Sequence, residues 1–304
     1  MSTQSQGDVS HSFVVMHLAA CSFLWGNSFL FMKLIGDGLN PLVIASLRAT
    51  GAFLVLAVVV ALLGQSVLPK GREWKDWAAL GTLNGWIPNT LVAFSLQSMD
   101  SGPAALIQSS GPLMTAVLAH FLLAGEKLNV QKVTAVMIGL VGVGLLIGPQ
   151  ALSGTGTILA IAGMLMVALG YSLGNIYTRR IPTAEPLRLA LGQQMFSTIF
   201  AGALGMSLFG FTGYAPASSH IWPLVMLSVF STAIPIWIFM RLIRYGGPTR
   251  AAMTGYLVPA VAVATGMIVL QEPVLLRQII GGAVVLIAVG IVTGALQWPV
   301  RRAA

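Results

Sequence analysis

The chain has 304 residues and a net charge of +8; 56% of its residues are hydrophobic and only 8% are charged, against about 25% charged in ordinary soluble domains. A soluble domain needs charged and polar side chains over much of its surface, so this composition excludes a soluble enzyme, a disordered chain and a nucleic-acid-binding module. The single cysteine, Cys21, excludes an intramolecular disulfide and any cysteine-based zinc or iron–sulfur site.

Long apolar stretches predict helices that cross a bilayer, since one crossing needs about 20 apolar residues. In chain order the predicted spans are residues 14–34, 42–63, 77–97, 103–124, 131–148, 156–178, 186–208, 221–243, 251–270 and 277–297. The stretches are continuously apolar rather than alternating, which argues against a transmembrane β-barrel. We therefore predict an all-α polytopic membrane protein with ten transmembrane helices.

The basic residues predict the orientation of these spans. With the N-terminus inside, only Lys33, Arg48 and Arg277 of the 16 Lys and Arg residues fall toward the outer side. The others gather at cytoplasmic ends and loops: Lys70, Arg72, Lys75, Lys127, Lys132, Arg179, Arg180, Arg188, Arg241, Arg244, Arg250, Arg301 and Arg302. This asymmetry follows the positive-inside rule and predicts a multi-pass protein of the cell's inner (plasma) membrane with both termini cytoplasmic.

Tryptophans fall into two groups along the predicted spans. Four lie at span ends, where indole rings anchor to the membrane interface: Trp74, Trp77, Trp222 and Trp298. Trp25, Trp86 and Trp237 lie inside spans, where this explanation does not apply. We therefore include the second group among the candidate site residues.

The sequence repeats itself weakly at an offset of 145–147 residues. Matched pairs include Pro41 with Pro186, Pro88 with Pro235, Pro112 with Pro259, and Glu126 with Glu272. Since each half holds five spans, an odd number, the second half must lie upside down relative to the first, as in many secondary transporters. The expected order is a cytoplasmic tail (1–13), a first five-helix repeat (14–148), a connecting loop (149–155), a second inverted five-helix repeat (156–297) and a cytoplasmic tail (298–304).

Four prolines lie in the middle of predicted spans, in two repeat-related pairs: Pro88, Pro112, Pro235 and Pro259. A mid-helix proline removes a backbone hydrogen bond and kinks the helix. In a membrane, the freed carbonyl group must find a partner or face a cavity. We expect these prolines to act as gating hinges; static kinks for packing are the alternative.

The fifth and tenth spans are almost wholly apolar and rich in glycine. Gly144 and Gly148 are spaced as a small-x-x-x-small motif, and Gly290 and Gly294 repeat it. Such motifs allow helices to approach closely. We expect packing helices outside the substrate path, in a monomer or in a dimer formed through these two helices.

Several motifs resemble those of the EamA-like exporters of the drug/metabolite transporter superfamily. They are Leu24-Trp25-Gly26-Asn27, Lys33, Arg48, the Pro112…Gly125-Glu126 pattern and the Pro259…Gln271-Glu272-Pro273 pattern. The resemblance covers residues 14–297. It implies export of small metabolites, often amino acids and including aromatic ones, by alternating access through a central cavity.

Polar and aromatic residues near the middle of the spans are the candidate substrate-binding set, since a mostly apolar cavity with a few amides is a common ligand site. They are Trp25, Asn27, Arg48, Trp86, Asn89, Gln108, Ser109, Tyr171, Asn175, Gln193, Trp237 and Tyr256. Hydrogen bonds between helices are the alternative role of the amides.

Arg48 is the one basic residue well inside a span, and such a charge is costly. It suits a carboxylate or phosphate, bound by paired hydrogen bonds; the alternative is a side chain that snorkels to the outer interface. Glu126 and Glu272 each precede a span and are expected to cap free helical N–H groups.

None of the eight acidic residues lies in mid-span, so we expect no carboxylate proton relay and no metal or cofactor. His17 and His120 lie within spans and are expected to be packed and hydrogen-bonded. The Gly-Tyr-Ser-Leu-Gly sequence at residues 170–174 lies in an apolar helix without an acid partner, so we predict no enzyme.

We therefore predict a facilitator or exchanger whose partners are a small-molecule substrate and the lipid bilayer. The substrate is expected to be a neutral or zwitterionic metabolite. A transporter of anionic metabolites such as sugar phosphates and a passive channel are the alternatives.

Overall fold

Helices joined by turns and loops make up the described residues, which contain no strand. The structure is a computed structural model that describes residues 11–122, 128–147, 155–179, 181, 185–242, 254–293 and 296. The first half contains α1 (His11–Ile35), η1 (Gly36–Gly38), α2 (Pro41–Leu62), α3 (Glu73–Leu80), η2 (Gly81–Trp86), α4 (Ile87–Ser95), α5 (Ser101–Gln108), α6 (Gly111–Leu122) and α7 (Val130–Ile147). The second half contains α8 (Thr155–Arg179), α9 (Pro186–Tyr214), η4 (Ala215–His220), α10 (Ile221–Val225), η5 (Met226–Ala233), α11 (Ile234–Arg241), α13 (Thr254–Val269) and α14 (Leu276–Thr293).

Five helical stretches among the described residues are long and apolar enough to cross a membrane. They are Ser12–Gly38, Pro41–Leu62, Ser101–Leu122, Gly156–Thr178 and Pro186–Phe239. Three shorter helices, Val130–Leu145, Leu257–Val269 and Leu276–Ile291, are also apolar. The described part of the chain is therefore all-helical, with helices that have the length and composition of membrane spans, while the number of ten crossings stays a prediction.

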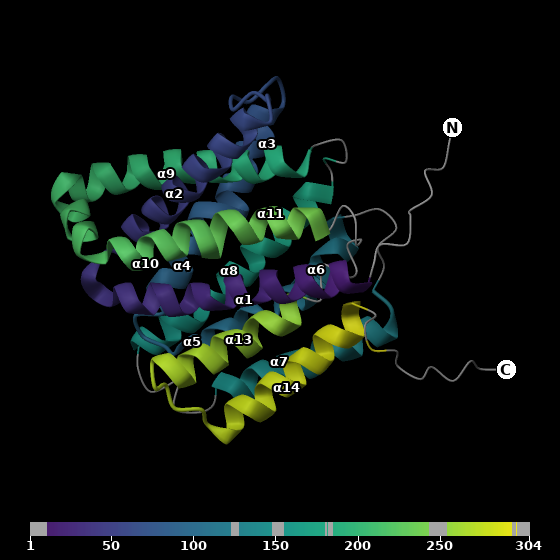
Figure 1. The fold of residues 1–304 in the computed structure, drawn as a ribbon. Helices are drawn as coiled ribbons and strands as arrows, with labels where there is room; N and C mark the ends of the chain where they lie inside the picture. Colours follow the sequence, from purple (N-terminus) through teal and green to yellow (C-terminus); the bar gives the residue numbers. More distant parts are fainter. Residues whose placement is uncertain are drawn as a thin grey trace, which may run out of the picture.

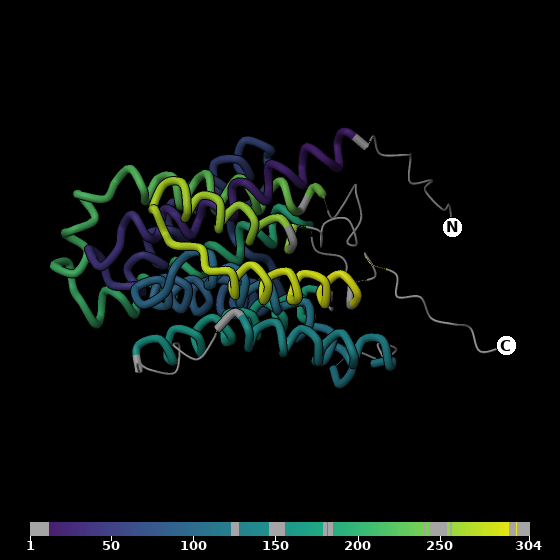
Figure 2. The backbone as a smooth tube through the Cα atoms, turned by 90° about the horizontal axis from the view of Figure 1, so that it is seen from below, coloured from purple at the N-terminus to yellow at the C-terminus, as the bar shows by residue number. Residues whose placement is uncertain are grey.

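Helices of the two halves pack against each other in antiparallel pairs. Gln65, just beyond α2, donates to Glu185, just before α9, and Tyr214 at the end of α9 donates to Ser46 near the start of α2. Figure 1 shows α2 and α9 along one side of the bundle and α7 and α14 along the other. Figure 2 shows that the helices run along one common direction.

Both halves contribute to the same hydrophobic core. The largest buried cluster joins Phe29 of α1 and Val43 of α2 to Met164 of α8, Leu227 of η5 and Ala262 of α13. Serine and threonine side chains within the helices bond to backbone carbonyls of the preceding turn, as Thr50 does to Ser46 and Thr90 to Trp86. These hydroxyls therefore need no water, which suits an apolar environment.

The fourth predicted span was expected to be one continuous helix, but the structure forms two helices there. α5 ends at Gln108, a turn follows at Ser109 and Ser110, and α6 begins at Gly111. The two serine hydroxyls donate to the carbonyls of Leu106 and Ile107 at 2.7 Å. Pro112, the second residue of α6, cannot donate a backbone hydrogen bond across this turn, and proline is tolerated at such a position.

Trp77 is fully buried, so the prediction that it anchors the chain at the membrane interface is wrong. Its ring lies where a side chain at Gly192 of α9 would be, and the Arg188 guanidinium lies 5.1 Å from the ring centroid. Packing between α3 and α9 therefore uses this tryptophan. Trp74 and Trp222 are exposed, and Trp298 lies outside the described residues.

α7 and α14 pack closely, but not through Gly144. A Cβ at Gly142 would lie 2.9 Å from Val284 Cγ1 and from the Val285 nitrogen, whereas a Cβ at Gly144 would have nothing within 4 Å. The glycines that permit the contact are thus Gly139 and Gly142, on the adjacent face of the helix. The motif residues Gly148 and Gly294 lie outside the described residues.

Candidate functional site

Two repeat-related helical stretches each contain a π-helical segment followed by a proline. η2 precedes Pro88, and η5 precedes Pro235. Because proline has no N–H, the carbonyl four residues before it lacks the usual helical donor. Those two carbonyls belong to Asn84 and Ser231.

Each of these carbonyls accepts a hydrogen bond from a side chain of the other half. Gln193 Nε2 of α9 donates to the Asn84 carbonyl at 3.2 Å, and Arg48 Nη2 of α2 donates to the Ser231 carbonyl at 3.3 Å. Arg48 and Gln193 are 145 residues apart, and Asn84 and Ser231 are 147 apart. The same contact therefore occurs twice, and the half that donates in one contact accepts in the other.

Small residues let the π-helical segments approach α2 and α9. Ser197 of α9 donates to the Gly81 carbonyl at 3.0 Å, and a Cβ at Gly85 would overlap the Ser197 hydroxyl. In the other half, a Cβ at Gly51 of α2 would lie 2.6 Å from Ser228 Cβ of η5. A serine faces a glycine at both contacts. The serine is on the long helix in one contact and on the π-helical segment in the other.

Arg48 is buried and bonded inside the protein, so the alternative in which it snorkels to the outer interface is wrong. Its Nε donates to Thr232 Oγ1 at 2.7 Å, and Thr232 in turn donates to the Leu227 carbonyl at 2.7 Å. Tyr171 of α8 is a neighbour of Arg48. The structure thus brings two predicted site residues, Arg48 and Tyr171, together with two residues of η5.

Three buried polar atoms of the π-helical segments and one of α9 have no hydrogen-bond partner within the described residues. They are Asn84 Oδ1, Trp86 Nε1, Gln194 Oε1 and Ser231 Oγ. Buried polar atoms in proteins are nearly always bonded, so each such exception calls for a ligand, a water or a second conformation. These four atoms are therefore candidates for contacts with a substrate.

Three other predicted substrate residues have local partners. Asn27 donates to the Phe23 carbonyl, Ser109 donates to the Leu106 carbonyl, and the Trp25 ring packs 4.9 Å from that of Phe239. These contacts lie within one helix turn or between neighbouring helices. They fit the role of packing groups as well as that of ligand contacts.

The remaining predicted residues are scattered. Asn89 is buried in α4, Gln108 is half-buried at the end of α5, and Asn175 of α8 is exposed. Trp237 is also exposed, and the Arg241 guanidinium lies 5.3 Å from its ring centroid. The side chain of Tyr256 lies outside the described residues.

The four predicted hinge prolines occupy two kinds of position. Pro88, Pro112 and Pro235 are each the second residue of a helical segment that follows an interruption, at η2, at Ser109–Ser110 and at η5. Pro259 lies inside the continuous helix α13. Three of the prolines therefore lie where the helical hydrogen bonding is already broken, and hinge motion stays a prediction.

The predicted histidines make local contacts. His17 Nδ1 lies 2.8 Å from the Phe13 carbonyl, and His120 Nδ1 accepts from the Leu128 nitrogen at 3.2 Å. His17 is half-buried, which fits the packed, hydrogen-bonded role that we expected, whereas His120 is hydrogen-bonded but exposed, so the expectation that it is packed is wrong.

A charged cluster joins the halves beyond one end of α2. Arg188 of α9 donates to both carboxylate oxygens of Glu73 of α3, at 2.8 and 2.5 Å. It also donates to the carbonyls of Ser66 and Leu68. Its guanidinium holds the pKa of the Glu73 carboxyl below the ordinary range.

Glu272 caps a helix of the opposite half rather than the helix that follows it. Its carboxylate accepts from the Ser101 nitrogen at 2.9 Å and from the Ser101 hydroxyl at 3.0 Å, at the start of α5. Burial raises the pKa of this carboxyl, although the two hydrogen bonds oppose the shift. The capping role predicted for Glu272 thus holds, with a different partner; Glu126 lies outside the described residues.

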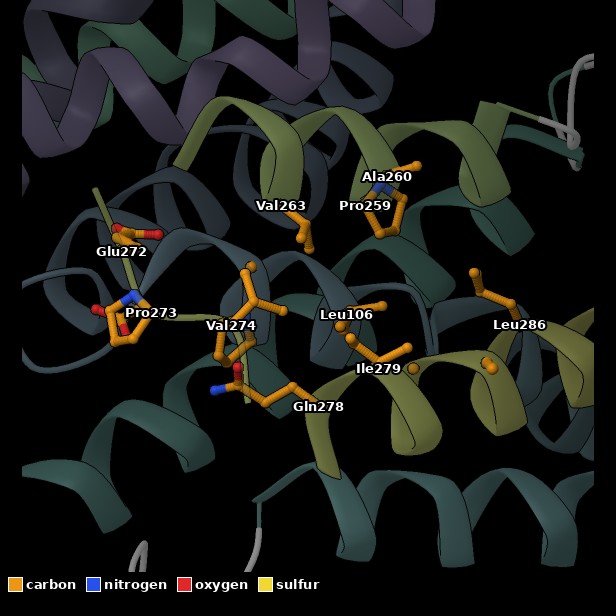
Figure 3. Close-up of a pocket in the computed structure, with 15 residues that line it drawn as sticks. Leu106, Pro259, Ala260, Val263, Glu272, Pro273, Val274, Gln278, Ile279 and Leu286 are labelled. Carbon is orange, nitrogen blue, oxygen red and sulfur yellow. The ribbon is translucent and has the colours of Figure 1, made fainter. Parts of the chain in front are cut away.

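A pocket of about 270 Å³ lies beside this cap, between α5, α13 and α14. Figure 3 shows apolar side chains such as Leu106, Val263 and Ile279 along it, with Glu272 at one end. Of the predicted site residues, only the hinge Pro259 lines it. The pocket is therefore distinct from the contacts around Arg48.

Sequence reasoning missed Asn84, Ser231 and Thr232, which partner the predicted residues Gln193 and Arg48. A signal for two of them was present, since a proline in a membrane helix marks the carbonyl four residues earlier as one that needs a donor. Thr232 carried no such signal, because only packing shows which hydroxyl Arg48 reaches.

Comparisons with known proteins give one consistent result. The sequence model of the EamA-like transporter family matches residues 12–148 and again residues 154–294. The uncharacterized transporter YoaV of Bacillus subtilis is 21% identical, with 95% of this chain and 99% of YoaV aligned. The uncharacterized inner membrane transporter YedA of Escherichia coli K12 is 28% identical, with 82% of this chain and 80% of YedA aligned.

A solved crystal structure has the same fold. It superposes with a TM-score of 0.67 at 18% sequence identity, and the alignment covers 94% of this chain and 99% of that one. At this identity the likeness shows the fold alone.

Proposed function

Since the chain belongs to the EamA-like transporter family, we propose that it is a secondary transporter that moves a small metabolite by alternating access. The repeated contact at the two π-helical segments is the observation that carries this proposal. Each half holds an interrupted helix against a helix of the other half. Two antiparallel halves built this way can exchange conformations, which closes the path on one side while it opens on the other.

The full proposal includes ten spans in two inverted repeats, with both termini cytoplasmic. The last residues of α14 and the first of α1 lie at one end of the bundle, which supports placing both termini on one side (Figure 1). The inner membrane is the proposed location, as it is for the relative YedA, whose name describes an inner membrane transporter. The direction of net flux that we propose is export.

Neutral or zwitterionic metabolites are the proposed substrates, with amino acids first and aromatic ones included. The contacts around η2 and η5 consist of amides, hydroxyls and a single cation. Such groups suit a small polar molecule without excess charge.

Counterflow in proteoliposomes tests the transport proposal. Vesicles preloaded with one unlabelled amino acid are diluted into a trace of its labelled form, at equal pH on both sides. A carrier accumulates label transiently and saturates, because exchange through an alternating site couples the two fluxes. A passive channel gives neither accumulation nor saturation, and this outcome would refute the carrier.

A transporter of anionic metabolites such as sugar phosphates is the second candidate, favoured by the buried cation of Arg48. Counterflow of a sugar phosphate, with none for any amino acid, would select it.

A further inference from the structure

Arg48 carries a positive charge that its hydrogen bond to the Ser231 carbonyl does not require. The same contact in the other half is made by Gln193, whose neutral amide donates to the Asn84 carbonyl at 3.2 Å, as Arg48 does to Ser231 at 3.3 Å. An amide therefore suffices to bond the carbonyl freed by the proline. The positive charge of Arg48 is additional, and a charge buried within a membrane protein is costly.

No carboxylate within the described residues lies at ion-pair distance from Arg48. Glu73 pairs with Arg188, Asp76 with Arg72, and Glu272 bonds to Ser101. Buried charges in proteins are nearly always paired, because an isolated one loses its hydration without compensation. The counter-charge of Arg48 must then come from outside this part of the chain.

Unused hydrogen-bond donors remain on the guanidinium and on a residue that it contacts. Nε and Nη2 of Arg48 are used by Thr232 and Ser231, while Nη1 has no hydrogen bond to any described residue. The hydroxyl of Ser231 is fully buried and has no partner, and it belongs to the residue whose carbonyl binds Nη2. Three guanidinium N–H groups and one hydroxyl, on a residue that Arg48 contacts, are thus left without an acceptor among the described residues.

We propose that Arg48 and the Ser231 hydroxyl bind the carboxylate of the transported substrate, which makes the substrate a monocarboxylate such as a zwitterionic amino acid. This inference rests on the proposed transport function. A carboxylate carries one negative charge and can accept two parallel hydrogen bonds, which matches one guanidinium better than a phosphate dianion does. Arg48 is then the residue that distinguishes acids from their amides.

Analogues that separate the carboxylate from the amine test the site in the wild-type protein. Leucine, 4-methylpentanoate and leucinamide are each added to purified protein, and the unfolding temperature is read by labelling of Cys21, the only thiol and fully buried. Alanine and phenylalanine, with their amides, are tested in parallel. The carboxylates are expected to raise the unfolding temperature, and the amides are not.

Arg48→Gln is the informative variant, because its amide can make the contact that Gln193 makes in the other half, while the charge and the hydrogen bond to Thr232 are lost. The concentration of amino acid needed for half-maximal stabilisation is expected to rise roughly tenfold or more, while the unliganded protein stays folded. Arg48→Lys keeps the charge but cannot make two parallel hydrogen bonds. Its half-maximal concentration is expected to lie between those of the wild type and Arg48→Gln. Arg72→Gln removes a charge from a side chain that is 77% exposed and should leave binding unchanged.

The possible results separate the two proposals. Equal stabilisation by acids and amides, or an unchanged preference for acids in Arg48→Gln, would overturn the carboxylate site. So would the absence of stabilisation by all three amino acids and by 4-methylpentanoate. Should carboxylates stabilise the protein without any counterflow, the transport function would fail and the binding site would stand.

Discussion

Arg188 ties the connection between α2 and α3 to α9 with more contacts than any single ion pair provides. It forms a fork with Glu73, reaches two backbone carbonyls and lies over Trp77. We expect Arg188→Ala to lower the free energy of unfolding by about 2–4 kcal/mol, because it leaves the Glu73 carboxylate without its counter-charge and removes hydrogen bonds to two carbonyls. The loss is read as a lower unfolding temperature of the variant. Arg188→Lys, which keeps the positive charge, should lower that temperature less.

The same pair predicts a pH dependence of stability. The pKa of Glu73 is lowered in the folded protein, chiefly by its hydrogen bond from Arg188, so ionisation of Glu73 stabilises the fold above the ordinary pKa of 4.5. This stabilisation is lost as the pH falls through the lowered value. The difference in unfolding temperature between wild type and Glu73→Gln should therefore be present at pH 7 and shrink below pH 4.5. A difference that is constant across this range would refute the assignment.

At the scale of the helices, the close approach of α7 and α14 depends on Gly142. Gly142→Ala places a methyl group 2.9 Å from the Val285 nitrogen and 3.0 Å from the Gly281 carbonyl, both backbone atoms that cannot rotate away. We expect a loss of about 1–3 kcal/mol in the free energy of unfolding, as for other overpacked contacts.

Gly144→Ala, on the same helix, is the matched control. Its new methyl group meets nothing within 4 Å, and alanine favours a helix over glycine by up to about 1 kcal/mol, so stability should hold or rise. Should Gly144→Ala prove the more damaging substitution, the small-x-x-x-small motif would be the packing face after all, in this fold or in a dimer.

For the whole molecule, the orientation in the membrane is the property to test. Leu68 lies between α2 and α3, close to Lys70, Arg72 and Lys75, whereas Ser218 of η4 has no Lys or Arg near it in sequence. Both side chains are exposed. By the positive-inside rule, an impermeant maleimide should label Ser218→Cys in intact bacterial cells and Leu68→Cys only after permeabilisation.

Cys21 is fully buried and stays unlabelled in the folded protein, so it need not be replaced. Labelling of both new cysteines from the same side would contradict the predicted topology. Labelling of Leu68→Cys alone in intact cells would reverse the predicted orientation.

Composition and hydropathy alone predicted a helical membrane protein, because a run of apolar side chains has few alternatives to a buried or lipid-facing helix. The weak repeat at 145–147 residues was also visible, and the family match to residues 12–148 and 154–294 agrees with it. Arg48 was visible as a candidate because a charge in an apolar stretch is rare. Hydropathy and the charge of Arg48 are local and can be read from a short window of sequence, whereas the repeat shows only when the two halves are aligned.

Only the tertiary structure decided which groups meet. It paired Arg48 with Ser231 and Thr232, Glu272 with Ser101, and Trp77 with Arg188, over separations of more than a hundred residues. It also moved the close contact of α7 from Gly144 to Gly142, since a helix buries whichever face its neighbour covers. The sequence thus determines which residues need a partner, and the packing of the two halves determines which partner each one finds.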